Sequence, residues 1–145
     1  MDWLKEFFAT VEREFCAVLA TASGQSVTMR TVSPVYYEGR VLIFTSSDSV
    51  KYRQLRENPV CCVAAGIFFD EAKEEFLGPT MSDANTELRA AYCRKFPDAF
   101  TEGVPLGGRE AEFILFTPFR PKGWAFEGGK TSGEGIPTMP FDAAV

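Results

Sequence analysis

The sequence contains no histidine among its 145 residues. Without histidine, the chain alone cannot build a Ser-His-Asp or Cys-His hydrolase centre, the usual zinc-enzyme ligand sets or a histidine-ligated haem site. This single absence excludes most catalytic sites that depend on side chains alone. It directs attention to ligands that bring their own chemistry.

Cysteine is also scarce, with Cys16, Cys61, Cys62 and Cys93 showing no C-x-x-C spacing. Adjacent residues of a strand point to opposite faces of its sheet, so Cys61 and Cys62 are poorly placed to bridge each other or to share a metal. We therefore expect reduced cysteines that pack as small apolar residues, and no metal site.

Positive charge and long apolar runs are both limited. The formal net charge is −5 and the sequence pI is near 4.8, which argues against broad binding of nucleic acid or anionic membranes. No apolar run approaches the roughly 20 residues that a spanning helix needs. The first 15 residues carry acids and lack a small-residue cleavage site, so we expect no secretory signal and a cytoplasmic protein.

Apolar residues recur at helical spacing in three segments. The first begins at the potential N-cap Asp2 and runs to residue 15; the second covers residues 48–57 and ends at Asn58-Pro59; the third covers residues 82–96. The spacing predicts three helices joined by segments of another kind.

The remaining segments resemble strands. Residues 16–46 predict three consecutive strands in an antiparallel meander, with Pro34 at a bulge or an edge of the second strand, residues 26–37. Later strands are expected at residues 60–69 (one buried strand covered on both faces), at 72–81, and over 111–119 and 123–128 (a last strand or a pair of strands broken around Pro118 and Pro121). Six or so antiparallel strands with helices predict a mainly β fold, a β-barrel or α+β domain.

An anion site is predicted between residues 41 and 59. The strand-like run VLIFTS delivers hydroxyl groups, including those of Thr45 and Ser49, to a helix start that carries Lys51. A helix N-terminus offers unpaired N–H groups to a phosphate. We expect the strand of Arg30 to pair with VLIFT across the Glu38-Gly39 turn, which brings Arg30 within reach. Phe44 would add an apolar wall, so the predicted ligand is a flat aromatic ring bearing a phosphate.

These motifs resemble a known family. RTVSPVY at 30–36, FTSSDSVK at 44–51 and LRENP at 55–59 are similar in register to the core of the pyridoxamine 5′-phosphate oxidase-like proteins, which are FMN-binding split barrels. The resemblance covers residues 1–126 and implies an antiparallel six-stranded split barrel. It leaves residues 127–145 as a tail rich in Gly and Pro.

The resemblance also implies a cofactor, a partner and a set of site residues. FMN would lie at the interface of a homodimer, with its phosphate held by Arg30, Ser49 and Lys51. The backbone of Thr31 and Val32 and the side chains of Phe44 and Thr45 would contact the flavin, and Trp124 is a candidate contribution from the partner chain.

The chain departs from the true vitamin B6 oxidases of this family. Val50 and Val35 replace basic residues, and the chain has no histidine for the substrate. We therefore expect a small single-domain relative that is not a pyridoxamine phosphate oxidase. The expected function is an FMN-dependent oxidoreductase acting on a small organic molecule, with reduced nicotinamide or another reduced carrier as donor. The alternatives are a non-catalytic flavin or small-ligand binding or sensing protein, a structural β-barrel whose ancestral site has decayed, and a relative that binds a deazaflavin or haem in place of FMN.

Overall fold

The computed structural model describes residues 2–100, 111–123 and 141–142. The elements in chain order are α1 (Trp3–Arg13), β1 (Ala17–Ser23), β2 (Ser26–Val32), β3 (Val35–Tyr37), β4 (Arg40–Ser46), α2 (Val50–Glu57), β5 (Val60–Ala65), β6 (Phe68–Pro79), the 3-10 helix η1 (Asp83–Asn85), α3 (Thr86–Lys95), β7 (Ala111–Gly123) and β8 (Phe141–Asp142).

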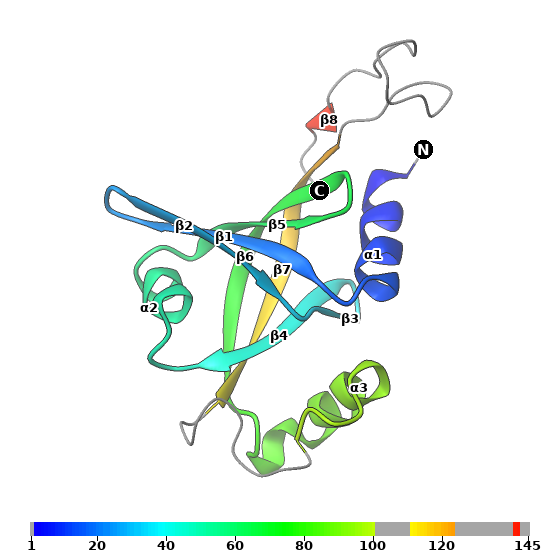
Figure 1. The fold of residues 1–145 in the computed structure, drawn as a ribbon, viewed down its shortest axis with the longest axis vertical. Helices are drawn as coiled ribbons and strands as arrows, with labels where there is room; N and C mark the ends of the chain where they lie inside the picture. The colour runs from blue at the N-terminus through cyan, green and yellow to red at the C-terminus, as the bar shows by residue number, and fades with distance from the viewer. Residues whose placement is uncertain (1, 101–110, 124–140, 143–145) are drawn as a thin grey trace.

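The strands form one antiparallel sheet in the order β2-β1-β5-β6-β7-β4-β3, and the short β8 pairs with β7. The sheet curves into a half-barrel, with α1 and α2 at opposite ends of it and α3 below β4 in the view of Figure 1. The mainly β class is confirmed. The prediction of six strands is wrong, because the described residues place seven strands along the main path of the sheet.

The extra strand arises at Ser33-Pro34. β2 pairs with β1, whereas β3 pairs with β4 at the other end of the sheet order. The expected long strand over residues 26–37 is therefore two strands, and the predicted meander is wrong. Proline has no N–H to donate to a ladder, so Pro34 suits a point where the chain leaves one ladder for another. Ser33-Pro34 is thus a crossover that links the two edges of the sheet.

Residues 60–69 also form two elements rather than the one strand that was expected. β5 and β6 make a hairpin that turns at Gly66, where φ is +60°, a value that glycine adopts at little cost. In β5 the buried residues alternate with more exposed ones, so only one of its faces is fully covered. Because apolar residues lie on both sides of this turn, the sequence pattern did not reveal the turn.

β7 is one continuous strand through Pro118 and Pro121, so these prolines do not break it. β4 pairs with β7 only from Ala111 to Phe116, whereas β6 follows β7 to Gly123. Beyond residue 116 one side of β7 is largely free of a neighbouring ladder among the described residues, and proline is tolerated at such an edge. The prolines accompany a shift in the β6–β7 register rather than a chain break.

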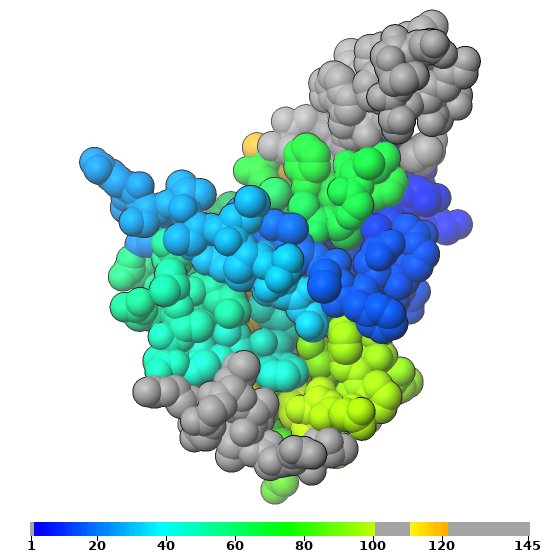
Figure 2. Space-filling view, viewed as in Figure 1, coloured from blue at the N-terminus to red at the C-terminus, as the bar shows by residue number. Residues whose placement is uncertain are grey.

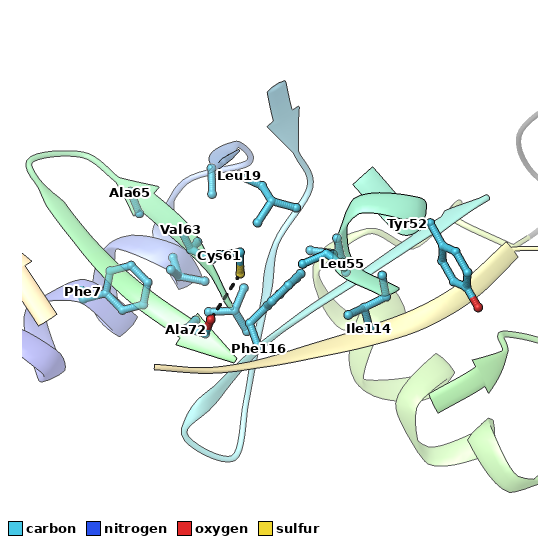
Figure 3. Packing of buried hydrophobic residues seen from close by; sticks show 14 residues of the cluster. Phe7, Leu19, Tyr52, Leu55, Cys61, Val63, Ala65, Ala72, Ile114 and Phe116 are labelled. Atoms are coloured by element: carbon cyan, nitrogen blue, oxygen red, sulfur yellow. Dashed lines mark hydrogen bonds between the residues drawn. The ribbon is translucent and has the colours of Figure 1, made fainter. Parts of the chain in front are cut away.

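Two clusters of buried side chains hold the sheet and helices together. The inner cluster comprises Phe7, Val11, Ala17, Leu19, Val41, Ile43, Tyr52, Leu55, Cys61, Val63, Ala65, Ala72, Ile114 and Phe116. It joins α1 and α2 to the concave face of the sheet, and Figure 3 shows its packing around Cys61, whose thiol donates to the carbonyl of Ala72 at 3.5 Å. The outer cluster comprises Val35, Leu42, Leu88, Tyr92, Phe113 and Leu115.

The two clusters explain the longest apolar runs of the sheet. In β4, Val41 and Ile43 belong to the inner cluster while Leu42 belongs to the outer one. α3 packs over the outer cluster through Leu88 and Tyr92. β4 is thus covered on both of its faces, which is the property that the sequence analysis had assigned to residues 60–69.

The three helices were predicted closely. The Asp2 carboxylate accepts from the N–H of Lys5 at 3.1 Å and caps α1, and Asn58 caps the C-terminus of α2. The third predicted helix is the pair η1 and α3. No helix within the described parts of the chain is long and apolar enough to span a membrane.

Candidate functional site

The candidate site includes the N-terminus of α2, which follows the polar C-terminal end of β4. The Ser49 hydroxyl accepts from the N–H of Tyr52 at 3.2 Å and caps the helix. Thr45, which is buried at the end of β4, donates from its hydroxyl to Ser49 Oγ at 3.1 Å. The cap is therefore held in place by the strand before it, and the first turn of α2 keeps a fixed orientation relative to the sheet.

Arg30 approaches the same helix from β2. Its guanidinium donates to the Leu19 carbonyl at 3.1 Å and to Thr21 Oγ1 at 2.8 Å, and it also donates to Thr28. These acceptors lie on the β1–β2 hairpin, so the strand of Arg30 pairs with β1 and not with β4 as expected. The predicted route to the helix is wrong, because the break at Ser33-Pro34 separates β2 from β3.

Gln54 connects this network to α2. Its side-chain oxygen accepts from Thr21 Oγ1 at 2.6 Å and from Thr28 Oγ1 at 2.5 Å, and Gln54 itself is buried. The same two threonines accept from Arg30. Sequence reasoning did not identify Thr21, Thr28 or Gln54 as site residues. The available signal was the spacing of Gln54 three residues after Lys51, which puts both on neighbouring parts of the helix surface.

Arg30 and Lys51 are close enough for their charges to interact. Burial lowers the pKa of Lys51 below the ordinary lysine value, and the positive charge of Arg30 lowers it further. Burial also lowers the pKa of Arg30. No carboxylate within the described part of the chain forms an ion pair with either side chain. Two partly buried cations next to a helix N-terminus create a local excess of positive charge that an anion would neutralise.

The remaining predicted residues lie in other surroundings. Phe44 points away from Thr45 to the outer face of β4, where its ring contacts Tyr92, Phe100 and Phe113 with centroid distances of 5.1, 5.2 and 6.4 Å. On β2, the side chain of Thr31 is exposed, and Val32 packs against the inner cluster. Trp124 lies outside the described residues.

Phe44 forms one wall of a cavity of about 360 Å³. The cavity lies between the crossover at Ser33, the C-terminal end of α3 and the residues that follow it. Its lining consists of Ser33, Phe44, Tyr92, Lys95, Phe96, Pro97, Asp98 and Ala99. Aromatic and aliphatic atoms dominate this surface, so the cavity suits a flat apolar group better than a highly charged one.

The described residues contain no group of three or more His, Cys, Asp or Glu side chains placed to hold a metal ion. All four cysteines are free of disulfides.

Comparison with known proteins identifies the fold. No protein-family model and no curated protein matches the sequence. A candidate pyridoxamine 5′-phosphate oxidase from Listeria innocua is 14% identical, with a TM-score of 0.62 over 83% of this chain and 96% of that chain. A FAD-binding protein from Mesorhizobium loti is also 14% identical, with a TM-score of 0.62 over 81% of this chain and 90% of that one.

A haem-binding protein from Mycobacterium smegmatis has a TM-score of 0.68 at 14% identity, over 95% of this chain and 58% of that chain. At such identities the likeness establishes the fold alone. The chain therefore has the split-barrel fold of the pyridoxamine 5′-phosphate oxidase-like proteins, as the motifs had predicted.

Proposed function

We propose that this split-barrel protein binds a flavin, specifically FMN, and uses it as an oxidoreductase. The observation that carries the proposal is the pair of cations, Arg30 and Lys51, beside the capped N-terminus of α2 with no described carboxylate to neutralise them. A phosphate monoester suits this site, because it can accept from both cations and from helix N–H groups. The FAD-binding neighbour is consistent with a flavin on this fold.

The residues of the chain would divide the work of binding. Arg30, Ser49 and Lys51 would hold the phosphate, and the network through Thr21, Thr28 and Gln54 would keep Arg30 turned towards α2. The apolar surface around Phe44 would exclude water from the ring region. A bound flavin supplies hydride and electron transfer, so the protein contributes binding, orientation and exclusion of water.

The proposal includes a homodimer in which the partner chain completes the site, with Trp124 as a candidate contact. The substrate would be a small organic molecule, and the donor a reduced nicotinamide or another reduced carrier. We propose the cytoplasm as the compartment, since such donors are available there.

Substitution of Lys51 by alanine tests the location of the phosphate. We expect Lys51→Ala to weaken FMN binding by about tenfold or more, because one charge-assisted contact is lost. FMN fluorescence quenching measures the dissociation constant, and circular dichroism checks the fold. Arg53→Ala is the matched control, since Arg53 is an exposed cation on the same helix. Equal affinities for wild type and Lys51→Ala would place the phosphate elsewhere.

The second candidate function is non-catalytic binding or sensing of a flavin or other small ligand. It is favoured by the lining of the 360 Å³ cavity, which offers few groups for proton transfer. Among the described lining residues the only carboxylate is that of Asp98, and the Tyr92 hydroxyl already donates to the Ser33 carbonyl. Steady-state oxidation of NADH and NADPH by the FMN-loaded protein, with and without quinone and nitroaromatic acceptors, distinguishes the two. Sustained turnover favours the oxidoreductase, whereas tight binding without turnover favours the sensor.

A further inference from the structure

Lys95, the last residue of α3, makes an unusual set of contacts for a lysine. Its ammonium donates to the carbonyl oxygens of Val11 at 2.6 Å, Glu14 at 2.5 Å and Pro34 at 2.7 Å. An ammonium group has three N–H donors, so these three acceptors satisfy it completely. The contacts connect residues that lie 61 to 84 positions away in the sequence.

Two of the three acceptors belong to the end of α1. The last carbonyls of a helix lack partners within the helix and carry partial negative charge, which favours a cation there. Lys95 therefore has an electrostatic reason to stay at this position. Burial lowers its pKa, while the nearby charges of Glu12 and Glu14 act in the opposite direction.

The third acceptor belongs to the crossover between β2 and β3. The carbonyl of Ser33, one residue earlier, accepts from the Tyr92 hydroxyl at 2.8 Å, and Tyr92 is buried in the outer cluster. Two consecutive carbonyls of the crossover are thus held by two side chains of α3. The sequence analysis identified neither Tyr92 nor Lys95 as a site residue.

The crossover has a direct geometric relation to the candidate site. It follows β2, which carries Arg30 three residues before Ser33, and Ser33 itself lines the 360 Å³ cavity together with Tyr92 and Lys95. Lys95 also lines a larger cavity of about 620 Å³ between α1, β3 and α3. Lys95 therefore lies between two hollow regions, at the point where the chain leaves β2 for β3.

We propose that Lys95 is a positioning residue of the candidate flavin site. By holding the Pro34 carbonyl against the end of α1, it fixes the crossover and with it the relative placement of the Arg30 phosphate contact and the apolar ring wall. The inference rests on the proposed flavin function, but it concerns a residue outside the phosphate-binding set.

The test compares Lys95→Met, which keeps most of the side-chain volume, with Lys95→Arg, which keeps the charge and donors. Amide hydrogen exchange is measured in the ligand-free proteins, and FMN affinity by fluorescence quenching. We expect Lys95→Met to speed exchange in residues 30–36 and at the end of α1, and to weaken FMN by about tenfold, the scale of lost hydrogen bonds to a charged group. Lys95→Arg should keep part of the wild-type protection from exchange and part of the wild-type affinity for FMN.

Arg94→Met is the matched control, because Arg94 is the exposed neighbour on the same helix. It should leave exchange in residues 30–36 and FMN affinity unchanged. Tyr92→Phe, which removes only the bond to Ser33, provides a milder variant in case Lys95→Met folds poorly, and it should produce the same local pattern to a smaller extent.

The proposal is overturned if the Lys95→Met and Tyr92→Phe proteins bind FMN as tightly as wild type, or if faster exchange spreads evenly over the whole sheet. A wild-type protein that binds no FMN would instead refute the proposed function. In that case, the exchange comparison in ligand-free protein still shows whether Lys95 holds the crossover.

Discussion

Asp70 is fully buried on β6, a costly location for a carboxylate. One of its oxygens accepts from the backbone N–H of Arg120 at 3.1 Å, and the other has no hydrogen-bond partner among the described residues. Burial, with a smaller contribution from the charge of Glu71, raises its pKa to about 7. The folded protein therefore favours the protonated acid more than the unfolded chain does.

This raised pKa predicts how stability depends on pH. Because the folded-state pKa lies above the unfolded value, the contribution of Asp70 is complete below about pH 4 and is lost as the pH rises to about 7. Asp70→Asn cannot ionise, so its free energy of unfolding relative to wild type should increase over this interval by up to about 4 kcal/mol. Urea unfolding at several pH values measures the difference.

Glu75→Gln is the matched control, because Glu75 is an exposed carboxylate on the same strand. A change of the same size for Glu75→Gln over this interval would mean that the burial of Asp70 is not its cause. Parallel pH profiles for Asp70→Asn and wild type would mean that the buried carboxyl group titrates alike in the folded and unfolded chains.

At the residue scale, local signals were more informative than distant ones. The roles of Asp2 as the cap of α1 and of Asn58 as the end of α2 depend on neighbours within four residues, so the sequence predicted them. The contacts of Arg30 join β1, β2 and α2, and those of Lys95 join α1, α3 and the crossover. Such contacts depend on how elements pack, which spacing along one chain does not encode.

Among the elements, α2 has two roles: its N-terminal cap stabilises the fold, and its first turn is part of the proposed FMN phosphate site. Replacing Ser49 by alanine removes the cap of this helix and the acceptor for Thr45, and should destabilise the fold by about 1 kcal/mol. Ser49→Ala should also weaken FMN binding, because the same first turn would face the phosphate. Thermal unfolding and FMN titration measure the two effects separately.

Ser82 offers a control for this element, because its hydroxyl caps η1 by accepting from the N–H of Ala84 at 3.3 Å. Ser82→Ala should cost a similar amount of stability without changing the affinity for FMN. If both serine variants bind FMN equally well, the first turn of α2 is not the phosphate site.

The strands show why some elements were predicted less well than the helices. Periodicity suggested β structure at residues 26–37 and 60–69 but did not reveal the changes of partner at Ser33-Pro34 and at Gly66. Pro118 and Pro121 were expected to break a strand, yet they lie where β4 no longer pairs with β7. In each case the deciding factor was the neighbouring strand, which lies far away in the sequence.

At the scale of the molecule, the motif register was a better guide to the fold than any single element. The order and spacing of Arg30, Ser49, Lys51 and the Asn58-Pro59 stop resemble those of the split barrels. The fold agrees with that resemblance, although the three structures described above are only 14% identical to this chain. The strand count was wrong, because the crossover divides one expected strand into two strands that lie at opposite ends of the sheet order.

The proposed homodimer depends on the outer surface of the whole molecule. Val27 and Met29 are 76% and 73% exposed on one face of β2, and their hairpin projects from the body of the molecule (Figure 2). Exposed apolar side chains grouped in this way favour contact with a second copy. We expect light scattering to give twice the chain mass of 16.1 kDa, and Met29→Lys to shift the protein towards monomer.

Met29→Lys should also lower the affinity for FMN, because the partner chain completes the proposed site. The loss would not come from direct contact with the phosphate site, since the side chains of Met29 and Arg30 point to opposite faces of β2. Ile67→Lys is the matched control, since Ile67 is an apolar residue that is 52% exposed at the β5–β6 turn. It should leave both mass and affinity unchanged. A monomeric wild type that binds FMN tightly would show that one chain suffices, and a dimeric Met29→Lys protein would move the interface away from β2.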